Sequence, residues 1–363
     1  MLGEAHRVSL PPSLTRMSKI LYKKVVSDPR RGQMSNILIT GGAGYIGSHV
    51  SKELLRQGHL PVIYDNLQTG HREATQHAQF IEGDLADAKK LRETFESFSI
   101  DSVMHFAADC QVGESVENPL KYFNNNVKNS LQLVEFMMDF NIRKLIFSSS
   151  ASVYGEPKKI PIPEEHPCLP LNPYGETKWI FEKVLQRLHE AKKLDYISLR
   201  YFNAAGADPE GELGEDHFPE THLIPISILA AINGKPIPIF GTDYDTPDGT
   251  CIRDYIHVTD LTRAHILALE RLESGGTSGM YNLGNGNGYS VKEVIETVRA
   301  VTGMKVDTIE TPRRPGDPAR LVAGSEKIKK EMGWRPQYPD LPAIVNTAWQ
   351  WHRKHPKGYE DKL

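Results

Sequence analysis

Thr40-Gly41-Gly42-Ala43-Gly44-Tyr45-Ile46-Gly47 is the stretch that decides the fold of this 363-residue chain. It follows an apolar run, Asn36 to Thr40, and it opens a segment, Tyr45 to Gln57, in which apolar residues recur at helical spacing. Gly58 then suits the left-handed position that ends many helices. A strand, a glycine-rich turn and a helix in this order predict the first unit of a doubly wound α/β sheet. The turn alone is weak evidence, because any tight turn favours glycine.

The glycines of this turn have the spacing Gly41-x-x-Gly44-x-x-Gly47, which lets backbone N–H groups approach a pyrophosphate at the start of a helix. The next apolar run ends at Asp65, 18 residues beyond Gly47, where a carboxylate accepts hydrogen bonds from the adenosine ribose of NAD. The same carboxylate would repel the 2′-phosphate of NADP. We therefore expect NAD as the cofactor, against the alternative that Asp65 is only a loop residue before Asn66.

Beyond the turn, short apolar runs alternate with longer segments of helical spacing, which is typical of a parallel sheet covered by helices. The predicted strands are Asn36–Thr40, Leu60–Tyr64, Gln79–Gly83, Ser102–Phe106, Lys144–Ser148 and Tyr196–Arg200. The predicted helices are Tyr45–Gln57, Leu120–Phe140, Tyr174–Lys192, Val258–Leu272 and Val291–Val301. After Tyr201 the alternation gives way to stretches rich in glycine, proline and aspartate. We therefore expect a Rossmann-type NAD-binding domain over residues 34–202. A smaller, irregular α/β substrate region would cover 203–363, with segments that return to the first domain.

Composition narrows the class of protein. The net charge of −3 provides no basic field for nucleic acid or an anionic membrane, and no run of 18 apolar residues could span a bilayer. Three widely separated cysteines, Cys110, Cys168 and Cys251, suit neither a disulfide framework nor a metal site, so we predict no metal and a reducing, cytoplasmic location. Residues 1–33 are basic and lack the apolar core of a signal peptide, which favours a disordered leader. A targeting extension and a start at Met34 are the other interpretations.

A catalytic pattern appears at Tyr174-Gly-Glu-Thr-Lys178, which places a phenol and an ammonium on one face of a predicted helix. A tyrosine is a poor base because its usual pKa is about 10, and a neighbouring Lys178 with a positive nicotinamide ring would lower that pKa. Ser148-Ser149-Ser150 ends the fifth predicted strand, at the edge where parallel sheets bind ligands. By chance alone, a Tyr-x-x-x-Lys pair is more often an ordinary helix face. Together with the glycine turn, it favours a catalytic tyrosine.

These motifs together are similar to those of the extended short-chain dehydrogenase/reductase family. The resemblance is closest to the branch that epimerises nucleotide sugars, and it covers nearly all of residues 35–357. It rests on the stretches TGGAGYIGSHV, HFAA, VGESVENPLKYFNNNV, FSSSASVYG, NPYGETK, LRYFNAAGA, DGTCIRDYIHVTDL and RRPGDPA. The resemblance implies an isomerase of galactose metabolism with tightly held NAD, which interconverts UDP-galactose and UDP-glucose through a transient 4-keto sugar.

The resemblance also assigns roles to residues. Tyr174 would take the proton of the sugar 4-OH, Lys178 would hold the nicotinamide ribose, and Ser150 would assist the proton transfer. The other residues placed around NAD are Gly41, Gly44, Tyr45, Ile46, Gly47, Asp65, Asn66, Asp84, Leu85, Phe106, Ala107, Asn125, Tyr201 and Phe202. Those placed around the UDP-sugar, besides Ser150 and Tyr174, are Asn203, His222, Leu223, Phe240, Arg253, Arg314 and Asp317. A helix N-cap is nearly as favoured for Asp84, and the two roles do not exclude each other.

Three positions depart from well-known members of that branch. Cys110 stands where a lysine is found, and His222 stands where an asparagine contacts the nucleotide. Leu321 replaces the bulkier tyrosine of strict glucose/galactose enzymes, which predicts room for N-acetylated UDP-sugars.

Other functions fit the sequence less well. A 4,6-dehydratase would have acidic residues after Ser150, where this chain has Ala151-Ser152. A UDP-glucuronate 4-epimerase and a non-catalytic NAD-binding regulatory subunit are the remaining alternatives. Apolar residues such as Leu133, Phe136 and Met137 are expected to face outward and, by resemblance, to help form a homodimer, although ordinary core packing would explain them too.

Overall fold

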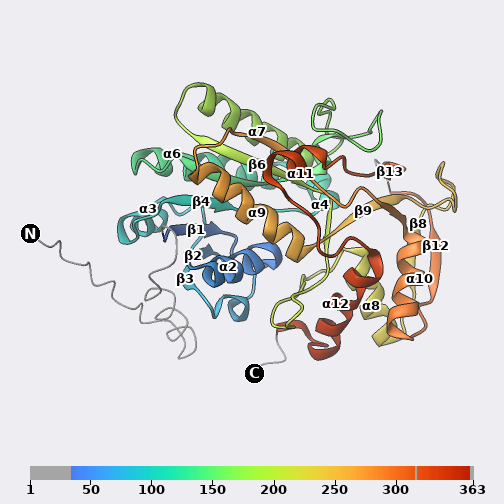
Figure 1. The fold of residues 1–363 in the computed structure, drawn as a ribbon. Coiled ribbons are helices and arrows are strands. Elements are labelled where there is room, and N and C mark those ends of the chain that lie inside the picture. Colours follow the sequence, from blue (N-terminus) through green and yellow to red (C-terminus); the bar gives the residue numbers. More distant parts are fainter. Residues whose placement is uncertain (1–33, 315–316, 360–363) are drawn as a thin grey trace, which may run out of the picture.

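The computed structural model describes residues 34–314 and 317–359, and the predicted leader, 1–33, lies outside them. At its centre is a seven-stranded sheet with the order β10-β6-β5-β4-β1-β2-β3, in which every pair is parallel. Figure 1 shows this sheet with its helices. The strands are β1 (Asn36–Thr40), β2 (Leu60–Asp65), β3 (Gln79–Glu82), β4 (Ser102–His105), β5 (Lys144–Ser150), β6 (Asp195–Tyr201) and β10 (Gly279–Leu283). The predicted doubly wound parallel sheet is confirmed.

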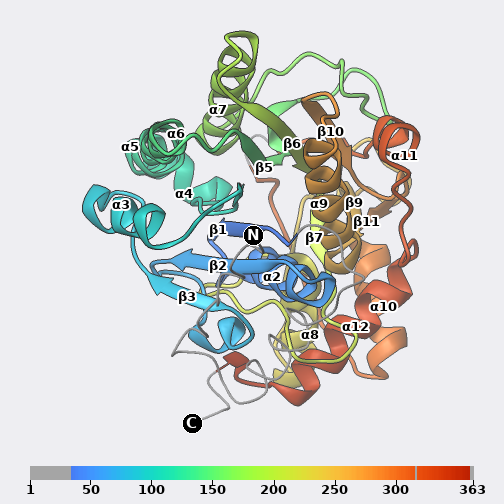
Figure 2. The same ribbon diagram turned by 60° about the vertical axis from the view of Figure 1, so that its left-hand side comes forward.

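Helices cover both faces of the sheet because successive strand residues point to opposite sides. In β1, Ile37 and Ile39 pack toward one face, and Leu38 packs toward the other. The first layer consists of α2 (Tyr45–Gln57) and α9 (Val258–Glu273), flanked by α11 (Glu326–Met332). The second layer consists of α3 (Ala88–Ser97), α6 (Asn129–Asp139) and α7 (Pro173–Glu190). Figure 2 shows the sheet between the two layers.

The long helix predicted over Leu120–Phe140 is present as one helical run that contains a π-helical segment. The structure has α4 (Val112–Glu117), α5 (Pro119–Tyr122), a π-helical segment η2 (Phe123–Lys128) and then α6. The apolar residues of α6 also differ from expectation. Leu133, Phe136 and Met137 are buried in the core rather than exposed, because they face the sheet between α3 and α7. The outward prediction for these three residues is therefore wrong.

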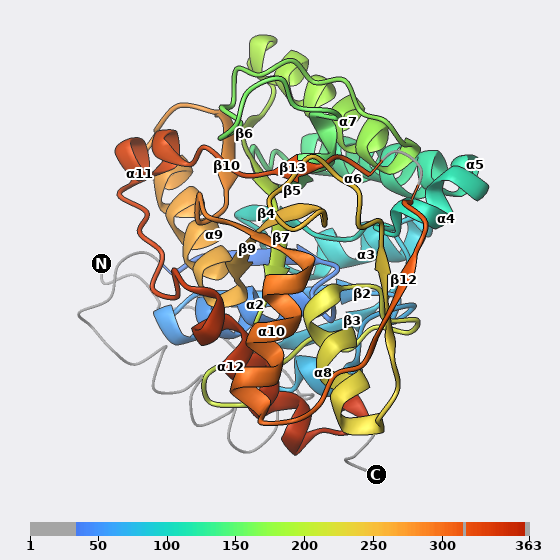
Figure 3. The ribbon, with the colours of Figure 1, turned by 90° about the vertical axis from the view of Figure 1, so that its right-hand side faces the viewer.

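The remaining elements form a separate, smaller layer. A four-stranded sheet contains β7 (Asn203–Ala205), β9 (Ile252–His257), β11 (Gly288–Ser290) and β13 (Arg320–Leu321), and β8 (Ile237–Phe240) pairs with β12 (Thr308–Thr311). They pack with α8 (Leu223–Asn233), α10 (Val291–Thr302) and α12 (Leu341–Lys354) around a third apolar core. Figure 3 faces these three helices. Short 3₁₀ turns, η1 (Arg72–Thr75) and η3 (Ala151–Val153), connect larger elements.

The two regions share elements. The seventh strand, β10, was not among the predicted strands, and it comes from the second half of the chain to pair with β6. Helix α9 likewise packs on α2. Among residues 34–314 and 317–359, no helix has both the length and the apolar character of a membrane span.

Candidate active site

The chain reverses direction across the sheet between β1 and β4, and the crevice at such a switch point is where doubly wound sheets bind ligands. The glycine turn lies there. Gly41 has a φ of +73°, and a Cβ on it would lie 2.5 Å from the Ala107 nitrogen. A Cβ on Gly47 would lie 2.4 Å from the Gly41 oxygen. Both glycines are therefore required by the protein's own packing.

Gly44 differs from its two neighbours in the motif. Its φ is −77°, and the nearest atom to an added Cβ is the Gly41 oxygen at 3.4 Å, an ordinary contact. The fold itself tolerates a side chain here, and an added methyl group would occupy the space in front of the helix start. Helix α2 begins at that point with no side-chain cap and no acidic residue in its first turn. Its free N–H groups and dipole suit an anion such as a pyrophosphate.

Asp65 supports the turn from the end of β2. Its Oδ2 accepts a hydrogen bond from the Ala43 N–H at 2.9 Å, and its Oδ1 accepts one from the Leu67 N–H at 2.8 Å. Burial raises the pKa of this carboxyl above its usual value. Asp65 is thus built into the turn, and it is more than the loop residue of the alternative interpretation.

A set of hydrogen-bonded polar residues extends from Asp65 toward the end of β3. The Asn66 side chain donates to Asp84 Oδ2 at 2.7 Å, and the Tyr64 hydroxyl donates to the Asp84 carbonyl at 2.8 Å. The N-cap interpretation of Asp84 is wrong, because Asp87 caps α3 by accepting from the Lys90 N–H. Leu85 is buried beside it in the core.

Tyr174 lies in the first turn of α7, whose N-cap Asn172 accepts a hydrogen bond from the Gly175 N–H. Its phenol forms a hydrogen bond with the Ser150 hydroxyl at the end of β5, which lowers the pKa of Tyr174. Burial acts in the opposite direction and is the larger effect, so the pKa of Tyr174 is raised overall. The structure therefore brings together the predicted tyrosine and serine.

Lys178 lies one turn beyond Tyr174, with its Nζ 5.8 Å from the centre of the phenol ring. The ammonium donates to the Ser148 carbonyl at 2.8 Å, and burial lowers the pKa of Lys178 to about 8. Tyr201 and Phe202 follow at the end of β6, where Ser150 pairs with Tyr201.

The π-helical segment η2 connects α7 to the loop after β4. The Asn126 side chain accepts from the Asp109 N–H and donates to the Asp109 carbonyl, both at 2.9 Å, and it also reaches Thr177 of α7. Asn125 donates to the Asp109 carboxylate at 3.0 Å. Single π turns often mark functional sites. Here the wider turn directs two successive amides at the loop that carries Phe106 and Ala107.

A buried ion pair behind the site was missed by the sequence analysis. Arg200 of β6 forms a two-bond contact with Glu182 of α7, at 2.9 and 2.6 Å, and Ser149 donates to the same carboxylate at 2.6 Å. Both charged side chains are almost fully buried. The pair fixes α7, and with it Tyr174, against the two strands that carry Ser150 and Tyr201. A lone arginine in a strand gives no signal of such a partner.

The residues predicted to hold a UDP-sugar lie mainly around β9. Asn203 donates to the Asp254 carbonyl at 3.1 Å, and Arg253 forms an ion pair with Asp317. Leu321 is the β13 partner of Arg253. The Arg314 guanidinium lies 3.8 Å from the centre of the Phe240 ring. Four of the predicted residues thus form two contacting pairs.

His222 occupies a different environment from the one expected. It directly precedes α8, which begins at Leu223, and its Nδ1 lies 2.7 Å from Glu215 Oε1 and 3.2 Å from Glu220 Oε1. The pKa of His222 is raised well above its usual value by these carboxylates, against the effect of burial. The ring is therefore engaged by the 215–222 loop.

The remaining predicted residues contact other parts of the protein, mainly by hydrogen bonds to the backbone or by packing. Tyr45 donates its hydroxyl to the Gly206 carbonyl at 2.7 Å, and Ile46 packs against the core of the first helix layer. The Phe106 ring lies 4.8 Å from His265, which in turn bonds the Tyr201 hydroxyl.

A doubly wound sheet with an uncapped helix start at its switch point and a tyrosine–lysine pair at the same edge defines the class of short-chain dehydrogenase-type nucleotide-binding proteins. Comparison with known proteins gives the family. The chain belongs to the NAD dependent epimerase/dehydratase family, whose model matches residues 37–284.

Individual relatives are closely similar. UDP-glucose 4-epimerase of Halalkalibacterium halodurans is 53% identical over 324 residues, which are 89% of this chain and 97% of the relative. A crystal structure of a UDP-glucose 4-epimerase is 54% identical with a TM-score of 0.87, over 89% of this chain and 99% of that one. The Brucella ovis UDP-glucose 4-epimerase, solved in complex with NAD, is 47% identical with a TM-score of 0.84, over 87% and 98% of the two chains.

Proposed function

We propose that this chain is an NAD-dependent isomerase that interconverts UDP-galactose and UDP-glucose in galactose metabolism. The observation that carries the proposal is the Ser150–Tyr174–Lys178 group at the carboxyl edge of the sheet, beside the glycine turn. The similar proteins named above, all UDP-glucose 4-epimerases, support it. The space before Gly44 and the uncapped α2 fit a dinucleotide pyrophosphate, and Asp65 with Asn66 would hold its adenosine end.

Within this proposal each protein group has one task. NAD, when bound, supplies reversible acceptance of the hydride from the sugar C4. Tyr174 accepts the proton of the 4-OH and returns it after the sugar has turned. Ser150 stabilises the phenolate through its hydrogen bond. The buried Lys178 would hold the nicotinamide ribose, and its charge would favour the phenolate once the site is filled.

The nucleotide end of the substrate would be held by the second region. Arg253 and Arg314 are planar cations suited to a diphosphate, and Asp317 and Phe240 hold their side chains in place. Asn203 and Leu223 complete the proposed substrate set, whereas the His222 ring is engaged by Glu215 and Glu220 instead. Such an arrangement grips the nucleotide while the hexose stays free to rotate, as epimerisation requires.

The deciding experiment incubates the purified chain with UDP-galactose and separates the nucleotide sugars by chromatography. We expect UDP-glucose at equilibrium without added cofactor, and NAD in the supernatant after the protein is denatured. Turnover of UDP-glucuronate with none of UDP-galactose would replace this proposal with the uronate alternative. Bound NAD without turnover of either would favour a regulatory subunit.

A second activity is favoured by Leu321. This half-buried side chain lies opposite Arg253 in the β13–β9 pair, and a leucine leaves more room than a tyrosine. We therefore propose that UDP-N-acetylglucosamine is also accepted. The Leu321→Tyr variant is expected to lose this turnover while it retains activity on UDP-galactose, and absence of the turnover in the unmodified chain would refute the idea.

We also propose a cytoplasmic homodimer. Leu131 and Met138 are seven residues apart on α6 and are 37% and 38% exposed, so they share an outward face. If this face packed against the same face of a second copy, the apolar surface of both copies would be buried.

A further inference from the structure

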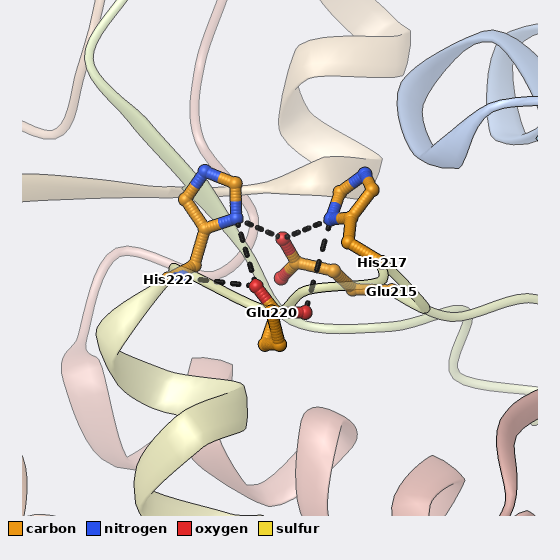
Figure 4. Close-up of side chains that lie close together, drawn as sticks. All are labelled: Glu215, His217, Glu220 and His222. Atoms are coloured by element: carbon orange, nitrogen blue, oxygen red, sulfur yellow. Dashed lines mark hydrogen bonds and ion pairs between the residues drawn. The ribbon is translucent and has the colours of Figure 1, made fainter. Parts of the chain in front are cut away.

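The loop before α8 carries two histidines and two glutamates that have no part in the proton transfer. They have the spacing Glu215-x-His217-x-x-Glu220-x-His222. All four potential ligand atoms lie within 4.8 Å of one another. Figure 4 shows both imidazoles directed at the two carboxylates.

The distances within this group are short and similar. His217 Nδ1 lies 3.4 Å from Glu215 Oε1 and 3.8 Å from Glu220 Oε2. His222 Nδ1 lies 2.7 Å from Glu215 Oε1 and 3.2 Å from Glu220 Oε1. Each histidine therefore presents the same ring nitrogen to both acids.

These contacts lack the directions of hydrogen bonds. Glu215 is only 4% exposed, yet its Oε1 forms no hydrogen bond with any described residue, and the same holds for the Nδ1 atoms of His217 and His222. Buried polar atoms are rarely left in this state. Three buried ligand atoms converge on one place at ion-pair distances but without well-directed hydrogen bonds, an arrangement that a bound cation would satisfy.

We propose that Glu215, His217, Glu220 and His222 bind a divalent transition-metal ion, with Zn²⁺ as the best match. Imidazole nitrogen and carboxylate oxygen bind Zn²⁺ at about 2.0–2.2 Å, usually in a tetrahedron. The corners of such a tetrahedron are about 3.3–3.6 Å apart by geometry, and the four N···O separations here range from 2.7 to 3.8 Å. The charge also balances, because two carboxylates neutralise one divalent cation and leave both imidazoles neutral.

The surroundings indicate a structural ion rather than a reactive one. The Tyr45 ring lies edge-on to His217 at 6.4 Å between ring centres, and the Tyr45 hydroxyl donates to Gly206 at the start of the same loop. His222 leads directly into α8. An ion at this point would cross-link the loop before α8. The cross-link would lie between the start of α2, on the cofactor side, and the start of α8, on the substrate side.

The test uses the full chain and the metal alone. The protein is treated with a chelator, desalted, mixed with ZnCl₂, and passed through a second desalting column before elemental analysis. We expect one zinc ion per chain, together with a higher midpoint of thermal unfolding. Replacement by Co²⁺ should give the intense visible absorption of tetrahedral cobalt. All three readouts are independent of epimerase activity and of bound NAD.

Variants assign the ion to this group. Glu215→Gln and His217→Gln are each expected to lose the retained zinc and the cobalt absorption, with unchanged far-ultraviolet circular dichroism. If the buried Glu215→Gln does not fold, the more exposed His222→Asn provides the same test. His189→Gln is the matched control, because His189 also contacts a carboxylate and its side chain is 42% exposed against 43% for His222. Absence of retained metal, or equal retention in the loop variants, would overturn the proposal.

Discussion

Tyr174 is a residue on which two opposing influences act. Burial favours its neutral phenol, whereas the Ser150 hydrogen bond favours the phenolate. A base held in this way is protonated in the protein alone, and it needs a positive charge nearby before it can act. The chemistry is therefore expected to depend on the phenol oxygen itself rather than on the shape of the ring.

Replacement of Tyr174 by phenylalanine tests this dependence. We expect kcat for UDP-galactose to fall by about 10²–10⁴-fold, the usual contribution of a positioned acid or base. Retained NAD should be unchanged, because the ring still fills its place. Tyr196→Phe serves as the control, since it removes a buried phenol from the opposite end of β6 and should keep kcat. Equal activity of Tyr174→Phe and the native chain would remove Tyr174 from the mechanism.

The burial of Lys178 is expected to lower the free energy of unfolding of the protein. Its pKa of about 8 in the folded state lies below the usual 10.5, so between these pH values the unfolded chain binds more protons. Stability therefore rises with pH through this window, and the full cost is present below about pH 8.

Lys178→Met should abolish turnover and yet stabilise the fold at pH 7, by up to about 3 kcal/mol at about 1.4 kcal/mol per tenfold change in a protonation equilibrium. Urea unfolding at pH 7 and at pH 10 measures the effect, and the gain should shrink at the higher pH. A variant that is less stable than the native chain at pH 7 would contradict this account.

Sequence suggested the candidate catalytic residues because they lie in short local patterns. The tyrosine, the lysine and the serine are predicted from one helix turn and one strand end, whereas the Arg200–Glu182 pair joins residues 18 positions apart on different elements. The 215–222 ligand group was also missed, because it contains no cysteine pair and lies in an irregular loop.

At the scale of elements, the three glycines of the motif are glycine for different physical reasons. Gly47→Ala should destabilise the fold by about 1–3 kcal/mol, because its Cβ would overlap the Gly41 oxygen. Gly44→Ala should change the free energy of unfolding by less than about 1 kcal/mol, yet reduce retained NAD severely. Urea titration and cofactor release measure the two quantities on each variant. Normal NAD content in Gly44→Ala would exclude a ligand in front of α2.

Element boundaries were predictable where one periodicity applied throughout. Strand β1 and helix α2 have the predicted limits, because strand, turn and helix are each signalled locally. The helix predicted at 120–140 is present from Pro119 to Asp139, but the apolar pattern continues unchanged through η2 and therefore gave no sign of its π-helical turn. Strand β10 was missed because its apolar run is broken by Asn282, whose side chain donates to the Ile162 carbonyl.

For the whole molecule, the proposed homodimer gives a direct measurement. The double variant Leu131→Glu/Met138→Glu should sediment at half the mass of the native species, because two charges on the α6 face would oppose its burial. Ile309→Glu, at an apolar position on β12 that is even more exposed at 54%, should leave the mass unchanged. A native chain that sediments as a monomer at micromolar concentration would refute the dimer.

Helix α9 and strand β10 come from the second half of the chain and complete the first region, which has a consequence for folding during synthesis. A ribosome that has delivered residues 34–202 has released six strands, but the outer edge of β6 is still without its neighbour and Ile197 and Leu199 lack their α9 cover. Such an intermediate exposes both an open edge and apolar surface, which invites aggregation. The nascent polypeptide therefore needs its second half in order to complete the first, and recombination could not exchange the two halves as independent modules.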